Sequence, residues 1–206
     1  MSRLTLDSIE IQKWFRDKGD LIHNLNYELN ENSVVVDLGG FTGVWAQQII
    51  NKYNSNIYII EPLKMYYDSL THKFQNNPKV NILNVGVATE EKQGSIFIDG
   101  DGSSTNTTSG IEEKVNFNTI DNILDIWNIP EVDLIQINIE GDEYPLMEYM
   151  IENNLLTRFK NIQVQFHLGI ENDVERRDKI HKGLESAGFV NKFNYPFVWE
   201  SWNRNN

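Results

Sequence analysis

The 206-residue sequence contains no cysteine. This absence excludes disulfide bonds, thiolate nucleophiles and zinc sites built on cysteine, and it is consistent with a reducing compartment. No apolar stretch approaches the roughly 20 residues that a transmembrane helix needs. The first residues, MSRLTLDSIEIQ, contain no signal-peptide core. We therefore expect a cytoplasmic protein without a membrane span.

Basic residues are also few. The 18 Lys and Arg against 30 Asp and Glu give a net charge of −12. A surface this negative repels the phosphates of nucleic acids and of anionic lipids. We therefore expect a small-molecule or glycan partner and no nucleic acid, and we leave the oligomeric state open.

Apolar strands alternate with amphipathic helices along most of the chain. The predicted strands are SVVVDLGG, NIYIIEP, KVNILNVGV, VDLIQINIEGD and NIQVQFHLG. The helices between and after them are predicted at about 43–53, at 63–75, over EYPLMEYMIENNLL and at 172–187. This alternation predicts an α/β fold with a doubly wound, mostly parallel sheet and helices on both faces.

Five further segments complete the prediction of a single domain over 1–206. Residues 8–30 predict one or two N-terminal helices, so that 1–32 packs on the core. GSIFID predicts a strand, and residues 99–110 predict a polar, glycine-rich loop on the substrate side. Thr119 is expected to begin a helix, and GFVNKFNYPFVWESWN predicts an antiparallel hairpin.

The turn DLGGFTG, at 37–43, follows the first strand, where such sheets bind their ligands. Its glycines do not fit the dinucleotide pattern G-x-G-x-x-G, and no nucleoside-triphosphate motif is present. The pattern is D-x-G-x-x-x-G, followed by an acid, Glu61, at the end of the second strand. An acid at that position suits ribose hydroxyls, whereas an acid in the turn repels pyrophosphate and suits a cation.

A ribose beside a cation and no phosphate describes S-adenosylmethionine. The combination resembles class I S-adenosylmethionine-dependent methyltransferases, which implies a Rossmann-like sheet of order 3-2-1-4-5-7-6 with an antiparallel strand 7. The alternative is that the glycines only permit close packing of strand and helix.

Several segments resemble the FkbM family of methyltransferases, in order, from about 34 to 168. They are VVVDLGGFTG, IYIIEP, NVGVATEEKQGSIFI, NFNTIDNILD, IQINIEGDEYPLM and IQVQFHL. Three positions depart from the family pattern: Gln136 and Asn138 replace Lys and Asp, and Gln165 replaces Glu. The resemblance implies transfer of a methyl group, most often to an oxygen of a sugar or another small polar metabolite.

The predicted cofactor is S-adenosyl-L-methionine, which leaves as S-adenosyl-L-homocysteine. The predicted cofactor-binding residues are Asp37, Gly39, Gly40, Phe41, Gly43, Glu61, Pro62, Gly86 and Val87.

An alcohol acceptor needs a group that removes its proton. His167 is the candidate base because its unperturbed pKa lies near neutrality. Glu140 is the alternative base or hydroxyl acceptor, and Asn138, two residues earlier, is predicted on the same strand face. Glu140 could instead cap the following helix, and Asp142 and Glu143 suit the dipole of its first turn.

Ser103, Ser104, Thr105 and Asp142 are predicted to contact the substrate. A Mg²⁺ site built from Asn138, Glu140, Asp142 and His167 is not favoured, because position 138 has lost its carboxylate.

The leading hypothesis is therefore a methyltransferase acting on a hydroxyl of a sugar or small glycan. The alternatives are an N-methyltransferase of a small molecule or protein, and a binding module that keeps the fold without the activity.

Overall fold

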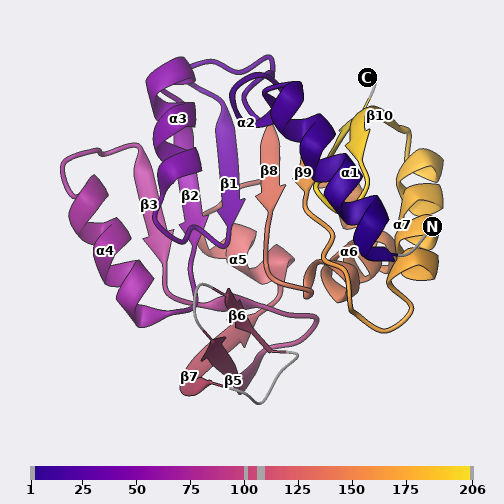
Figure 1. Cartoon of the computed structure of the whole chain (residues 1–206). Coiled ribbons are helices and arrows are strands. Elements are labelled where there is room, and N and C mark those ends of the chain that lie inside the picture. Colours follow the sequence, from indigo (N-terminus) through magenta and orange to yellow (C-terminus); the bar gives the residue numbers. More distant parts are fainter. Residues whose placement is uncertain (1–2, 100–101, 106–109, 205–206) are drawn as a thin grey trace.

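The computed structural model describes residues 3–99, 102–105 and 110–204. Figure 1 shows a large sheet with helices on both faces and a smaller sheet beyond the carboxyl ends of its strands.

The large sheet has the predicted strand order. Its seven strands are β1 (Val34–Leu38), β2 (Asn56–Ile60), β3 (Val80–Leu83), β8 (Leu134–Ile137), β9 (Asn161–Val164), β10 (Phe189–Tyr195) and β11 (Trp199–Arg204). They lie in the order β3-β2-β1-β8-β9-β11-β10. The strands β3, β2, β1, β8 and β9 pair in parallel, whereas β11 is antiparallel to both β9 and β10. This is the order 3-2-1-4-5-7-6 with an antiparallel strand 7, which confirms the predicted fold class.

The helices form two layers, one on each face of this sheet. They are α1 (Arg3–Arg16), α2 (Gly19–Ile22), α3 (Val44–Tyr53), α4 (Lys64–Phe74), α5 (Ile120–Ile126), α6 (Glu143–Glu152) and α7 (Asp173–Ser186), with a 3-10 turn η1 (Leu155–Arg158). Successive strand residues face opposite layers, because side chains alternate across a sheet. Val35 packs in the core formed with α3 and α4, and Val36 packs in the core formed with α5, α6 and α7.

The second sheet differs from the prediction. Its strands are β4 (Gly86–Val87), β5 (Lys92–Asp99), β6 (Gly102–Ser104) and β7 (Ile111–Asn118), in the order β4-β7-β5-β6. The strand in GSIFID is confirmed, but β6 lies inside the predicted loop 99–110, and β7 was missed. The sequence IEEKVNFN buries only Val115 and Phe117, so β7 lacks a continuous apolar pattern. Residues 100–101 and 106–109 of the predicted loop lie outside the described residues.

The N-terminal helices lie earlier in the chain than predicted, because the first begins at Arg3 rather than near residue 8. The second one ends at Ile22, and residues 23–33 follow a non-helical path to β1. A side-chain turn contributes to this path, since Asn30 Oδ1 accepts a hydrogen bond from the Asn32 N–H at 2.9 Å. Trp14 of α1 is buried, and the centroid of its ring lies 5.1 Å from the ring centroid of Tyr195 on β10. The domain boundaries 1–206 stay a prediction.

Within the described ranges, no helix combines the length and apolar character that crossing a membrane requires.

The start of α3 gives a test of how closely this fold is packed. A Cβ at Gly43, which has φ 66°, would lie 2.6 Å from Leu70 Cδ2 and 2.8 Å from Phe74 Cε2. A Cβ at Gly188, which has φ 85°, would meet nothing within 4 Å. Gly43→Ala should lower the free energy of unfolding by about 2–4 kcal/mol, because backbone strain and overpacking add. Gly188→Ala should cost only about 1 kcal/mol. Urea denaturation of both variants measures the difference, and equal losses would contradict the packing argument.

Candidate functional site

The glycine turn joins β1 to α3, and its glycines do not all have one role. Gly39 has φ 84°, and a Cβ there would lie 2.2 Å from the main-chain oxygen of Asn138. Position 39 therefore requires glycine, because the segment after β8 passes directly beside it. Cβ atoms at Gly40 and Gly43 would instead meet Ile59 and Leu70. At these two positions the alternative interpretation, close packing of helix and sheet, describes the contacts.

The first cavity, of about 270 Å³, lies at the carboxyl ends of β1, β2 and β8. Six of the nine predicted cofactor residues line it: Gly39, Phe41, Glu61, Pro62, Gly86 and Val87. Asn138, Glu140, Thr105 and Asp142 line it as well. The tertiary structure thus brings predicted cofactor, catalytic and substrate residues together around one cavity.

Glu61 fixes the turn to the end of β2. Its two carboxylate oxygens accept hydrogen bonds from the backbone N–H groups of Leu63 and Phe41, each at 2.9 Å. Burial raises the pKa of Glu61 above its usual range, and the two backbone bonds counteract part of that shift. A carboxylate oxygen has two lone pairs, so each oxygen can accept one further hydrogen bond from a ligand.

Aromatic side chains supply the apolar wall of the first cavity. The rings of Phe41 and Tyr66 lie 4.5 Å apart, and Phe117 packs so closely on Gly86 that a Cβ there would lie 2.5 Å from its ring. An aromatic wall of this kind suits a planar base. The prediction missed Tyr66 and Phe117 as site residues. Their aromatic character was the one available signal, and it fits a core position equally well.

Asp37 does not line the first cavity; it lines a second one on the other side of the turn. A buried hydrogen-bonded chain leads to it across the sheet. Tyr27 Oη donates to Gln163 Oε1 at 2.6 Å, Gln163 Nε2 donates to Gln136 Oε1 at 2.8 Å, and Gln136 Nε2 donates to Asp37 Oδ1 at 3.3 Å. Burial raises the pKa of Asp37 to about 7, which the Gln136 bond opposes and the charge of Glu61 reinforces.

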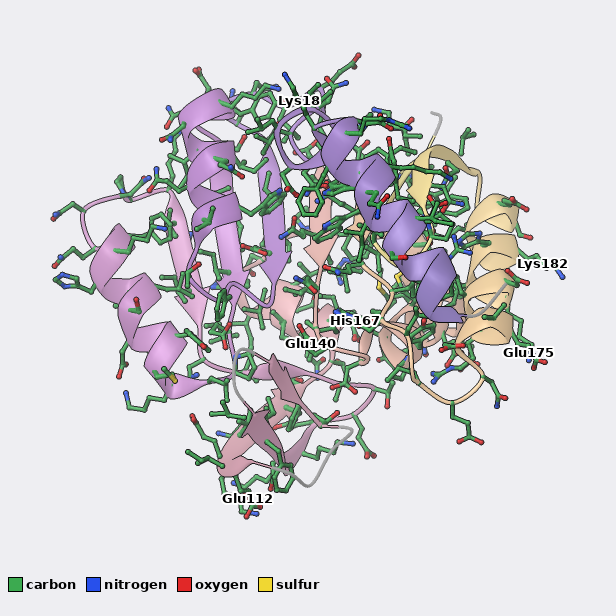
Figure 2. The ribbon with its side chains drawn as sticks, in the orientation of Figure 1. Lys18, Glu112, Glu140, His167, Glu175 and Lys182 are labelled. Carbon is green, nitrogen blue, oxygen red and sulfur yellow. The ribbon has the colours of Figure 1, made fainter. Side chains whose placement is uncertain are left out.

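The predicted catalytic residues meet beside the first cavity. His167 Nδ1 lies 2.9 Å from Glu143 Oε1, and His167 Nε2 lies 3.6 Å from Glu140 Oε2. Figure 2 shows Glu140 and His167 next to each other at the edge of the large sheet that faces the small one. Glu143 is fully buried and also accepts the backbone N–H groups of Gly141 and His167, at 2.8 Å and 2.6 Å. Glu143 was predicted only to suit the dipole of the helix that it begins, but it also orients the ring of His167.

The charges around His167 decide its protonation. Burial acts to lower the pKa of His167, but the hydrogen bond and charge of Glu143, together with the charge of Glu140, outweigh burial. The pKa of His167 is therefore raised above its ordinary value. Glu140 lines the first cavity, whereas His167 is not among the residues that line it and contacts it through Glu140.

One geometric expectation was wrong. Asn138 and Glu140 do not share a strand face, because β8 ends at Ile137 and both residues lie in the turn that follows. Glu140 has φ 55° and Gly141 has φ 107°. A left-handed backbone at a glutamate is strained, and such strain concentrates at functional sites. The turn, rather than strand alternation, brings both side chains to the first cavity.

The predicted substrate residues are placed in part. Thr105 Oγ1 donates to Asp142 Oδ2 at 2.7 Å, so the segment after β6 contacts the start of α6 at the cavity wall. The backbones of Ser103 and Ser104 belong to β6, and their side chains lie outside the described residues. In the described ranges, no group of three or more His, Asp or Glu has an arrangement that could hold a metal ion.

Comparison of the sequence with models of protein families gives no match, and comparison with curated proteins gives no significant match. The structure is similar to that of an rRNA-methylase candidate from Clostridium thermocellum, with a TM-score of 0.54 and 12% identity over 86% of this chain and 89% of the other. It is also similar to an rRNA methylase from Streptococcus thermophilus, with a TM-score of 0.51 and 13% identity over 86% of this chain and 90% of the other. A third similar structure is the Methanococcus jannaschii fibrillarin pre-rRNA processing protein, with a TM-score of 0.52 and 14% identity over 85% of this chain and 67% of the other.

At these identities the similarity concerns the fold alone. The chain has the Rossmann-like fold of class I S-adenosylmethionine-dependent methyltransferases.

The buried position of Asp37 predicts a dependence of stability on pH. The folded state retains the Asp37 proton up to about pH 7, whereas a free side chain releases it near 3.8. Between these pH values the folded state binds more protons than the unfolded state, so Asp37 makes the free energy of unfolding fall as pH rises. Asp37→Asn removes the charge but keeps an oxygen for Gln136. The free energy of unfolding of the variant minus that of wild type should therefore be larger at pH 8 than at pH 4, by on the order of 2–4 kcal/mol. Urea denaturation of both proteins at both pH values measures this change, and the same difference between variant and wild type at both pH values would refute it.

Proposed function

We propose that the protein is an S-adenosylmethionine-dependent O-methyltransferase that acts on a hydroxyl of a sugar or small glycan. The observation that carries this proposal is the juxtaposition of Gly39, Glu61, Asn138 and Glu140 around one cavity. His167 Nε2 lies 3.6 Å from the Glu140 carboxylate. The motif resemblance to the FkbM family supports the same acceptor class.

The residues of the first cavity fit the cofactor. Glu61 has lone pairs for the two ribose hydroxyls, and Phe41, Tyr66 and Phe117 provide an apolar wall for the base. Asn138 Oδ1 is buried beside Gly39 and has no hydrogen-bond partner among the described residues. An unpaired buried oxygen of this kind requires a donor, such as an ammonium group.

When bound, the cofactor supplies an electrophilic methyl group on a positively charged sulfur. Glu140 and His167 then hold and remove the acceptor's proton. With Nδ1–H donated to Glu143, His167 Nε2 is free to accept a proton, and it faces Glu140. Removal of the proton as the carbon–oxygen bond forms is the step that an alcohol needs.

The acceptor is expected to be small rather than a nucleic acid. The net charge of −12 disfavours a polyanionic substrate.

Cofactor binding is the first test. Isothermal titration with S-adenosylhomocysteine should show binding, and Glu61→Gln should weaken it about tenfold or more, because one hydrogen bond loses its acceptor and the other loses its charge assistance. Asp68→Asn, at an exposed acid paired with Lys64, should leave the affinity unchanged. Absence of binding at high micromolar concentration would remove the proposal.

Turnover tests the base. Labelled cofactor with a panel of sugars and oligosaccharides, read by mass spectrometry, should show a gain of one methyl group. His167→Ala and Glu140→Gln should each lower kcat by about 10²- to 10⁴-fold without changing cofactor affinity.

Activity should rise with pH through a pKa above that of a free histidine, since the base must be unprotonated. Glu143→Gln should move this rise to lower pH, because it removes the charge that raises the pKa of His167.

Two outcomes would favour the alternatives. Turnover that is indifferent to both His167 and Glu140 would indicate an amine acceptor, because a neutral amine needs less help from a base. Cofactor binding without turnover on any acceptor would indicate a binding module.

A further inference from the structure

The turn 39–43 holds its backbone in an unfavourable conformation. Gly39, Phe41 and Gly43 have φ values of 84°, 46° and 66°, which all lie in the left-handed region. Glycine adopts such angles freely, but for a bulky residue such as phenylalanine they are strained. Strain of this kind persists only where the surrounding structure imposes it. The contacts that impose it on Phe41 are therefore part of how the site is built.

The backbone at and before Phe41 is held by β2 and the residue after it. The Gly39 N–H donates to the Ile60 oxygen at 3.0 Å, and the Phe41 N–H donates to Glu61 at 2.9 Å. The ring of Phe41 lies against that of Tyr66, with 4.5 Å between the ring centroids. Phe41 is nevertheless 45% exposed, so burial in the core does not fix its position. The backbone on its other side must be held as well.

Lys73 of α4 holds the backbone after Phe41. Its Nζ donates to the main-chain oxygens of Thr42 at 2.9 Å and of Gly43 at 2.8 Å. Lys73 is not among the described residues that line the first or the second cavity. It therefore acts on the site through the turn and not by touching a ligand.

This contact has an electrostatic cost. Lys73 lies in the last turn of α4, where the helix dipole favours a cation. Its ammonium group bonds to the start of α3 instead, where the dipole of that helix disfavours one. Partial burial also lowers the pKa of Lys73 from its ordinary value, because the charge loses part of its water. The two hydrogen bonds that fix the turn offset these costs.

Other side chains of α4 face the same turn. Tyr66, Leu70 and Lys73 are separated by four and three positions, so they lie on one face of the helix. Leu70 packs on Gly40 and Gly43, where added Cβ atoms would lie 3.2 Å and 2.6 Å from its side chain. Tyr66 packs on the aromatic ring of the turn, and Lys73 bonds to the backbone that follows this ring. One face of α4 thus supports the whole turn.

We propose that Lys73 is a positioning residue of the cofactor site. Its two hydrogen bonds hold the turn 39–43, with the ring of Phe41 against Tyr66, in the binding conformation before the cofactor arrives. A turn that is ordered in advance loses little conformational entropy on binding, so the cofactor binds more tightly. This inference rests on the proposed function, which assigns the first cavity to the cofactor.

A second lysine provides the matched control. Lys79 precedes β3, and its Nζ donates to the main-chain oxygens of Glu31 at 2.8 Å and of Asn54 at 2.7 Å. It makes two bonds of the same kind as Lys73, but at the amino end of β3, whereas the first cavity lies at the carboxyl ends of the strands. Lys73→Met and Lys79→Met should therefore lower thermal stability by similar amounts and differ in their effect on the site.

Isothermal titration with S-adenosylhomocysteine measures this difference. Lys73→Met should weaken binding about tenfold, because the cofactor must then order the turn. Lys79→Met should leave the affinity unchanged. Lys73→Arg keeps donors for both main-chain oxygens and should restore most of the affinity.

Hydrogen exchange of the ligand-free protein tests the order of the turn itself. The amides of residues 39–43, followed by mass spectrometry, should exchange faster in Lys73→Met than in wild type, because the local structure opens more often. In Lys79→Met they should exchange at the wild-type rate.

The outcomes separate the inference from the function on which it rests. Wild-type affinity in Lys73→Met, an equal loss in Lys79→Met, or a loss that Lys73→Arg shares in full would overturn the inference. So would exchange of residues 39–43 that is the same in wild type and Lys73→Met. Failure of wild type to bind S-adenosylhomocysteine would count against the proposed function, and the exchange comparison would still decide whether Lys73 fixes the turn.

Discussion

The site depends on one close approach, that of Gly39 to the main chain of Asn138. No side chain fits between them, because even a Cβ would lie 2.2 Å from the Asn138 oxygen. This contact brings the turns after β1 and β8 together at the carboxyl edge of the sheet. Both cavities form around it, and the residues that they share are those of the contact itself and the adjacent Phe41. A larger residue at 39 would separate the two turns and merge or close the cavities.

Two buried acids organise the surroundings of this contact in different ways. Glu143 is saturated: it accepts two backbone N–H groups and lies beside the His167 ring, so it links the turn after β8, the start of α6 and the segment after β9. Asp37 has one side-chain partner within the described residues, the neutral amide of Gln136, and its pKa is raised. The first acid stabilises the fold and orients a base. The second lines the second cavity, and burial raises its pKa, so its charge depends on pH near neutrality.

The chain of Tyr27, Gln163, Gln136 and Asp37 shows how substitutions in a motif change meaning in three dimensions. The sequence marked Gln136 only as a departure from the FkbM pattern, in which Lys is usual. In the fold, Gln136 lies between Gln163 and Asp37 in adjacent strand registers, and each amide donates to the next residue. With a neutral amide rather than a cation at 136, burial raises the pKa of Asp37, so this acid keeps its proton up to about pH 7. The departure thus alters the electrostatics of the site without interrupting the hydrogen bonds of the sheet.

The sequence by itself determined the doubly wound α/β class, the position of the glycine turn and most of the residues around the first cavity, whereas the strand order came from the motif resemblance. Apolar periodicity is local, and parallel strands separated by helices meet at one edge, so Gly39, Glu61 and Glu140 could be placed together from their positions alone. Only the tertiary structure decided that Asp37 faces away from the first cavity, that Glu143 orients His167 and that β7 completes a second sheet. These features depend on strand register, on the left-handed backbone at Glu140 and on partners up to about a hundred residues away in the chain, such as Gln136 for Asp37. No local pattern encodes such partners, because each is selected by the packing of the whole domain.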